Sequence, residues 1–113
     1  MTKTAFLFPG QSSQSVGMMQ AYGHLPAIKK TFEEASDLLG QDMWDLVQNG
    51  PTEALNQTTN TQPVMLTAGV AVYRAWQEMG GFQPDFVAGH SLGEYSALVA
   101  AEVLTFAEAL PLV

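Results

Sequence analysis

Phe86-Val87-Ala88-Gly89-His90-Ser91-Leu92-Gly93 is the stretch that decides how this chain is built. An uninterrupted apolar run leads into Gly-x-Ser-x-Gly, and mostly helix-forming residues follow it. This order predicts a buried strand, a tight turn and a helix, with the hydroxyl of Ser91 exposed at the turn. Glycine is needed at Gly89 and Gly93, because a side chain at either position would collide with the neighbouring strand or helix. A serine displayed in this way is a candidate nucleophile.

A second strand is predicted near the start of the chain, over Ala5–Phe8. Like residues 86–89, this run is continuously apolar and ends at a glycine-containing turn, as expected of parallel strands that are buried on both faces. If the two strands are neighbours, the loop Phe-Pro-Gly-Gln at residues 8–11 opens on the same edge of the sheet as Ser91. The backbone N–H groups of Gln11 and Leu92 could then both donate to an oxyanion formed at the serine.

The segment between the two strands predicts helices, and alternating strand and helix patterns favour an α/β fold class. Apolar residues at helical spacing indicate a helix between Pro26 and Gly40. Residues 57–62 are polar and are predicted to form a loop. A long helix with an apolar stripe is predicted to begin at Pro63 and to stop before Gly80.

After the serine, a buried helix is predicted over residues 92–104, because apolar residues lie on more than one of its sides. Thr105 and Glu108 fit a capping box, which predicts the start of another helix. Pro111 then stands where that helix needs a backbone donor. No repeat or linker divides residues 1–113, although a sheet of two strands is too small for a finished architecture.

Composition narrows the range of partners. The 113 residues are 47% hydrophobic and 13% charged, and the formal net charge is −7. This acidic balance argues against nucleic acid or an anionic membrane as a partner. Cysteine is absent, so no thiolate zinc site is expected and no metal is predicted. Every apolar run is well short of the roughly 20 residues of a membrane helix, so a cytoplasmic protein is expected.

A serine nucleophile needs a base within hydrogen-bonding distance, and the chain offers two histidines, His24 and His90. Successive residues leaving a strand point to opposite sides, so the side chain of His90 should project away from Ser91. His90 is therefore interpreted as structural, with a substrate-facing role as the alternative. His24 lies in a connection flanked by glycine and proline. Taken alone, the motif is also compatible with a chance turn in which Ser91 only caps the helix.

Three motifs together make the sequence resemble a known family. They are Phe-Pro-Gly-Gln at residues 8–11, Thr-Gln-Pro at 61–63 and Gly-His-Ser-Leu-Gly-Glu-Tyr-Ser-Ala at 89–97. The chain resembles malonyl-CoA:acyl carrier protein transacylases and, through the longest motif, the acyltransferase domains of polyketide and large fatty acid synthases. The resemblance implies that residues 1–113 are the N-terminal portion of one acyltransferase α/β domain, which is incomplete. It implies a partial α/β-hydrolase-like three-layer core, with a small parallel sheet flanked by helices and the ferredoxin-like subdomain absent.

The resemblance also implies a reaction in fatty acid biosynthesis. Ser91 would attack malonyl-CoA, and the phosphopantetheine thiol of acyl carrier protein would then collect the malonyl group. Coenzyme A enters as a thioester substrate, and no bound cofactor is implied. The family's oxyanion hole maps to the backbone of Gln11 and Leu92. Gln62 could face the same cleft, or it could cap the helix that is expected to begin near Pro63.

The family's catalytic histidine lies far downstream of the serine, and its malonyl-binding arginine lies shortly after the region covered here. The 113-residue chain is therefore predicted to be inactive or nearly so. Two alternatives stay open: a serine esterase or thioesterase of α/β-hydrolase type, and a non-catalytic fragment. Such a fragment would be stabilised by self-association or by pairing with its complementary C-terminal segment.

Overall fold

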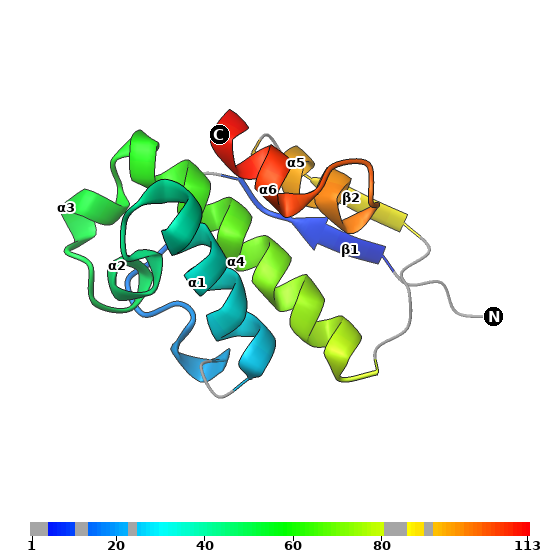
Figure 1. Ribbon diagram of the computed structural model, residues 1–113, viewed down its shortest axis with the longest axis horizontal. Helices are drawn as coiled ribbons and strands as arrows, with labels where there is room; N and C mark the ends of the chain where they lie inside the picture. Colours follow the sequence, from blue (N-terminus) through cyan, green and yellow to red (C-terminus); the bar gives the residue numbers. More distant parts are fainter. Residues whose placement is uncertain (1–4, 11–13, 23–24, 81–85, 90–91) are drawn as a thin grey trace.

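The computed structural model describes residues 5–10, 14–22, 25–80, 86–89 and 92–113. They form a two-stranded parallel sheet flanked by helices, and helix α4 runs between α1 on one side and the sheet with α5 and α6 on the other (Figure 1). The elements are β1 (Ala5–Phe8), the 3-10 helix η1 (Gln20–Tyr22), α1 (Pro26–Leu39), α2 (Met43–Asn49), α3 (Thr52–Leu55), α4 (Thr58–Glu78), β2 (Phe86–Gly89), α5 (Gly93–Ala100), α6 (Phe106–Ala109) and the 3-10 helix η2 (Leu110–Leu112).

The sheet confirms the two expected strands and their parallel pairing. Ala5 lies opposite Phe86, and Phe8 lies opposite Gly89. The expectation that both faces would be buried is wrong. Within β1 only Phe8 is buried, while Leu7 is 76% exposed. Burial on both faces requires a layer on each side of the sheet, and among the described residues nothing covers the side of Leu7.

The helical layer holds most of the apolar core. Helix α1 begins with Pro26 and ends at Gly40, whose φ of 68° is the left-handed conformation that glycine adopts readily. The interior face of α1 is formed by Ile28 and Phe32, both fully buried against α4. This is the helix that the apolar spacing predicted, with the same first residue.

Helix α4 begins earlier than predicted. Residues 57–62 were expected to be a loop, yet the helix starts at Thr58 and contains Pro63 in its second turn. The buried hydroxyl of Thr61 explains the extension, because it donates to the carbonyl oxygens of Leu55 and Gln57. These bonds satisfy backbone acceptors that precede the helix. Pro63 lies beyond the first four backbone donors, which lack intrahelical acceptors, so it removes one hydrogen bond from the second turn of the helix.

Helix α5 is shorter than predicted. It ends at Ala100, not at Leu104, because Glu102 adopts a left-handed conformation with φ 64°. The N–H of Glu102 bonds to Val99 O at 3.0 Å and that of Val103 to Leu98 O at 2.9 Å, a pairing that closes a helix C-terminus.

The last helix, α6, starts as the sequence predicted. Thr105 Oγ1 accepts from the N–H of Glu108 at 3.1 Å, and the Glu108 carboxylate accepts from the N–H of Thr105 at 3.0 Å. This reciprocal pair is the predicted capping box. The α-helix ends at Ala109, and Pro111 lies in the 3-10 helix η2.

Candidate active site

The parallel pairing brings the ends of both strands to one edge of the sheet. Because Phe8 lies opposite Gly89, the residues that follow β1 and those that follow β2 leave the sheet side by side. Pro9 and Gly10 continue from β1, and Gly10 is buried. On the other strand, α5 begins at Gly93, four positions after Gly89. A strand thus passes into a helix through a very short connection.

Two glycines allow this connection to be tight. A Cβ atom placed on Gly89 would lie 2.0 Å from both the carbonyl carbon and the oxygen of Gly93. A Cβ atom on Gly93 would lie 2.0 Å from the carbonyl oxygen of Phe8 and 2.9 Å from that of Pro9. The first turn of α5 therefore lies directly against the ends of both strands. Any larger side chain would have to displace backbone atoms.

Leu92 stands at the N-cap of α5. Its backbone is helical, with φ −53° and ψ −33°, and its side chain is buried. The first N–H groups of a helix have no acceptor within the helix, and the helix dipole makes this end electropositive. Glu94, in the first turn, is exposed and has the charge that the dipole favours. Backbone donors are thus gathered at the point where α5 meets the turn.

Three of the residues predicted for the site, Gln11, His90 and Ser91, lie outside the described residues. Gln62 lies inside α4 and is half-buried. Since the helix begins at Thr58, the alternative that Gln62 caps it is wrong.

Sequence reasoning missed a close contact among α4, α5 and β1. Gly69 lies in the middle of α4 and is closely packed. An added Cβ would lie 3.0 Å from Ser96 Oγ and 3.3 Å from Phe8 Cδ1. Ser96 is buried in α5. This small-residue contact lets α4 and α5 approach each other where both meet β1. A glycine inside a long helical pattern was the available signal.

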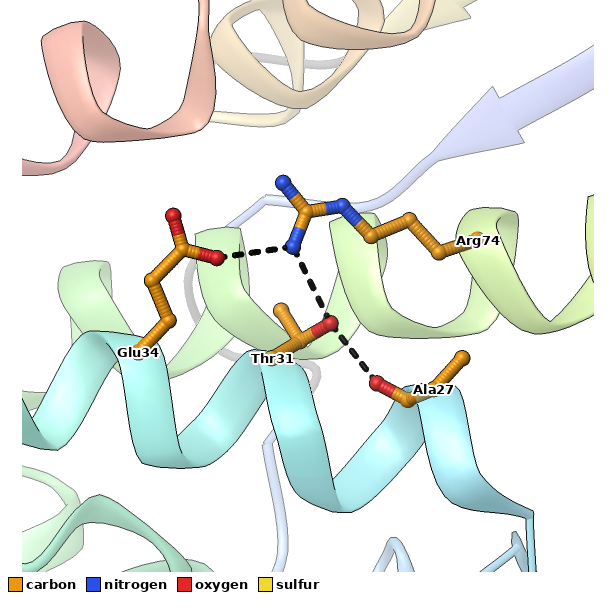
Figure 2. A network of polar contacts seen from close by, with 4 residues as sticks. All are labelled: Ala27, Thr31, Glu34 and Arg74. Carbon is orange, nitrogen blue, oxygen red and sulfur yellow. Dashed lines mark hydrogen bonds and ion pairs between the residues drawn. The ribbon is translucent and has the colours of Figure 1, made fainter.

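Arg74 joins three helices and is occupied by internal contacts. Its Nη1 donates to Glu34 Oε2 at 3.0 Å and to Thr31 Oγ1 at 3.3 Å, and Thr31 in turn donates to the carbonyl oxygen of Ala27 at 2.7 Å (Figure 2). The guanidinium carbon also lies 5.2 Å from the centre of the Phe106 ring, within the range of a cation–π contact. Arg74 therefore ties α4 to α1 and α6.

Two side chains have perturbed pKa values for evident reasons. Burial raises the pKa of the Tyr73 hydroxyl, and the negative charge of Glu102 raises it further. Hydrogen bonds from the backbone and the side chain of Thr105 lower the pKa of Glu108. Over the described ranges, no group of three or more potential metal ligands comes together, and no helix is long and apolar enough to cross a membrane.

The described residues form a parallel sheet flanked by helices, and α5 begins four positions after β2 ends. This arrangement places the chain in the α/β class. A family model described as acyl transferase domain matches residues 5–113. The chain belongs to this acyl transferase family.

Close relatives carry specific names. The malonyl CoA-acyl carrier protein transacylase of Salmonella typhimurium is 57% identical over 114 residues, covering 100% of this chain and 37% of the relative. A crystal structure of acyl-carrier-protein S-malonyltransferase from Burkholderia pseudomallei matches with a TM-score of 0.96 and 61% identity, over 98% of this chain and 36% of that one. A malonyl-transacylase in complex with its type II PKS acyl-carrier protein matches with a TM-score of 0.94 and 54% identity, over 98% and 36%. The chain thus spans little more than a third of the length of these relatives.

Proposed function

We propose that Ser91 is the acyl-accepting nucleophile of a malonyl-CoA:acyl carrier protein transacylase. The observation that carries the proposal is the packing of Gly89 and Gly93, which excludes any Cβ on either side of the serine and sets the start of α5 against the end of β1. A turn of this kind displays the residue at its apex. Relatives that match 98–100% of the chain are named for malonyl transfer.

In the proposed reaction, Ser91 Oγ attacks the thioester carbonyl of malonyl-CoA and loses its proton. The tetrahedral intermediate collapses by breaking the carbon–sulfur bond, so coenzyme A leaves as a thiol and malonyl stays esterified to Ser91. The phosphopantetheine thiol of acyl carrier protein then attacks the ester, and the serine hydroxyl is restored. Coenzyme A acts as a substrate carrier, and the reaction needs no bound cofactor.

The oxyanion of each tetrahedral intermediate would accept hydrogen bonds from the backbone N–H groups of Leu92 and Gln11. The N-cap position of Leu92 in α5 supports the first assignment. The common sheet edge of β1 and β2 supports the second, because the chain continues from Gly10 at the same edge. Removal of one such donor typically lowers kcat by about 100- to 1000-fold.

The proton that Ser91 loses requires a base, and we propose that this base lies outside residues 1–113. His90 precedes the serine in the sequence and is proposed to be structural or to face the substrate. The chain is then the N-terminal portion of a larger domain with an α/β-hydrolase-like three-layer core, and the ferredoxin-like subdomain would belong to the portion not represented here. By itself the chain should have little or no transfer activity. A cytoplasmic location is part of the same proposal.

The test is mass spectrometry after incubation with malonyl-CoA. Residues 1–113 would be joined to the portion of the Burkholderia pseudomallei relative that follows its matched segment. We expect a malonyl adduct on Ser91, no adduct in Ser91→Ala, and an unchanged adduct in the control Ser36→Ala on α1. A wild-type level of adduct in Ser91→Ala would refute the assignment.

Two further measurements separate the related possibilities. If the unjoined 113-residue chain transfers malonyl efficiently, the argument for an external base is wrong. If the joined chain releases malonate to water faster than it transfers malonyl to a carrier thiol, the esterase interpretation is favoured.

A further inference from the structure

A hollow of about 280 Å³ lies at the end of α5 that is remote from the candidate active site. It is lined by α4, the last turn of α5, the connection that follows this helix and the start of α6. Gly93 begins α5, whereas Val99 and Ala100 at its other end line the hollow. Sites for small molecules are typically about 300–1,000 Å³, so this hollow has room for a small metabolite. We call it the α4–α6 cleft.

The hydroxyl of Tyr73 is the most informative group in the α4–α6 cleft. Tyr73 is only 5% exposed, and its hydroxyl is buried without a hydrogen-bond partner among the described residues. The large majority of buried polar side-chain atoms are paired in native proteins. Burial raises the pKa of this hydroxyl, and the negative charge of Glu102 raises it further. Tyr73 and Glu102 both line the cleft, so the hydroxyl is available to a polar group bound there.

The side of the cleft at Glu102 is electronegative. Glu102 is exposed and has a φ of 64°, a conformation that is costly for residues other than glycine. Backbone outliers of this kind cluster at sites that hold ligands. Val99 and Ala100 belong to the last turn of α5, where the helix dipole adds negative potential. The carboxylate, the helix end and the phenolic oxygen of Tyr73 together favour an ammonium group.

Arg74 provides the opposite charge. Its Nη1 atom donates to Glu34 and Thr31, but its second terminal nitrogen takes part in neither bond (Figure 2). A guanidinium group binds a carboxylate well, because it offers several N–H donors in one plane. Among the described residues, Arg74 and Glu102 are the charged groups that line the cleft. The cleft therefore suits a ligand that carries one positive and one negative charge.

The remaining lining is mostly apolar. It includes Val70, Val99, Ala100, Leu104 and Phe106. Val70, Ala100 and Phe106 are buried, so these side chains form firm walls. An aliphatic group packed against them would be removed from water, which is favourable. A ligand with an ammonium group, a carboxylate and a branched aliphatic chain thus matches the charged and the apolar parts of the lining.

We propose that the α4–α6 cleft binds a free α-amino acid with a branched aliphatic side chain, of the size of leucine. Its ammonium group would donate to the Glu102 carboxylate and to the phenolic oxygen of Tyr73, and its carboxylate would accept from Arg74. A simple anion fits less well, because Glu102 and the formal net charge of −7 repel it. The cleft and the nucleophile turn lie at opposite ends of α5, so the proposal does not depend on the role of Ser91.

The test is titration calorimetry of L-leucine with the 113-residue chain. We expect one molecule to bind per chain with a dissociation constant of about 1 mM or lower. Two related probes each lack one of the charges: 3-methylbutylamine has no carboxylate, and 4-methylpentanoate has no amino group. Each should bind at least about tenfold more weakly than leucine, because hydrogen bonds between charged groups are the strong ones.

Two variants test the residues that carry the proposal. Tyr73→Phe removes a buried hydroxyl that has no partner among the described residues, so the chain should stay folded while leucine binding weakens about tenfold. Glu102→Gln removes the charge that would hold the ammonium group and should also weaken binding by about tenfold or more. Tyr22→Phe and Glu53→Gln are the matched controls. Neither residue lines the cleft, so both affinities should stay within about twofold of the wild type.

Three outcomes would overturn the proposal. The first is that leucine at about 10 mM gives neither binding heat nor a rise in the melting temperature, since a bound ligand stabilises the folded state. The second is that either probe with a single charge binds as tightly as leucine. The third is that Tyr73→Phe and Glu102→Gln behave like their controls. Failure of the proposed function has a different signature: if leucine binds as expected but the joined chain forms no malonyl adduct on Ser91, the cleft assignment stands and the nucleophile assignment falls.

Discussion

Substitution of Gly93 by alanine tests the geometry on which the candidate site depends. The new Cβ would lie 2.0 Å from the carbonyl oxygen of Phe8, 2.7 Å from its carbonyl carbon and 2.9 Å from the carbonyl oxygen of Pro9. Favourable contacts between heavy atoms are about 3.5–4.0 Å, so the helix or the strand must shift by roughly 1.5 Å or more. All three atoms belong to the backbone at the end of β1, and the pairing of β1 with β2 restrains this part of the backbone.

The size of the effect follows from two opposing contributions. Overpacking of a well-packed site costs about 1–3 kcal/mol and occasionally more, and contacts with three backbone atoms place this site at the upper end. The backbone of Gly93 is outside the left-handed region, so alanine gains up to about 1 kcal/mol of helix propensity. The net loss in the free energy of unfolding should be at least about 2 kcal/mol, a large part of the total of roughly 5–15 kcal/mol.

Urea unfolding of the two proteins measures this loss, and Gly40→Ala is the control. An added Cβ at Gly40 meets nothing within 4 Å, but the φ of 68° is unfavourable for alanine, so a loss of about 1 kcal/mol is expected from backbone strain alone. If Gly93→Ala is no more damaging than Gly40→Ala, the packing of Gly93 against Phe8 and Pro9 is looser than the structure indicates, and the argument for a serine held between two glycines fails.

Three further substitutions test the helical layer. Tyr73→Phe should raise stability by about 1 kcal/mol, because the hydroxyl is buried and has no hydrogen-bond partner among the described residues. Folding raises the pKa of Tyr73, so the wild type should also lose stability as the pH rises from about 10 through the folded-state pKa of this group. If the stability of Tyr73→Phe falls in the same way with alkaline pH, this explanation is wrong. Glu102→Gly should stabilise by about 1 kcal/mol in urea unfolding by removing the penalty of φ 64°, whereas destabilisation would mean that the carboxylate is needed. A double-mutant cycle of Arg74→Ala and Glu34→Ala should give a coupling energy of about 0.2–1 kcal/mol, because the two side chains are 37% and 42% exposed. A coupling energy near zero would show that the ion pair does not contribute to stability.

The elements that the sequence predicted well are those with a local cause. Pro26 and Gly40 limit α1 by their own backbone preferences, and the Thr105 capping box fixes α6 through bonds between residues three apart. The tight approach at Gly89 and Gly93 was also expected, because the strand–turn–helix order requires it. In each case the decisive interaction lies within a few residues of the pattern.

The elements that were mispredicted depend on distant or unusual contacts. Residues 57–62 look like a loop, yet Thr61 bonds to carbonyls before the helix and extends α4 backwards. Glu102 ends α5 early in a conformation that glutamate seldom adopts, which no helix-forming pattern reveals. The exposure of Leu7 could not be predicted either, because the sequence of an apolar strand is the same whether or not another element covers it.

The helical layer and the sheet differ in how completely they are packed, and this bears on the site. Ile28 and Phe32 are fully buried in α1, while on β1 only Phe8 is buried, so most of the apolar stabilisation comes from the helices. The start of α5 is restrained by the sheet, because a Cβ atom on Gly93 would meet the carbonyl oxygens of Phe8 and Pro9.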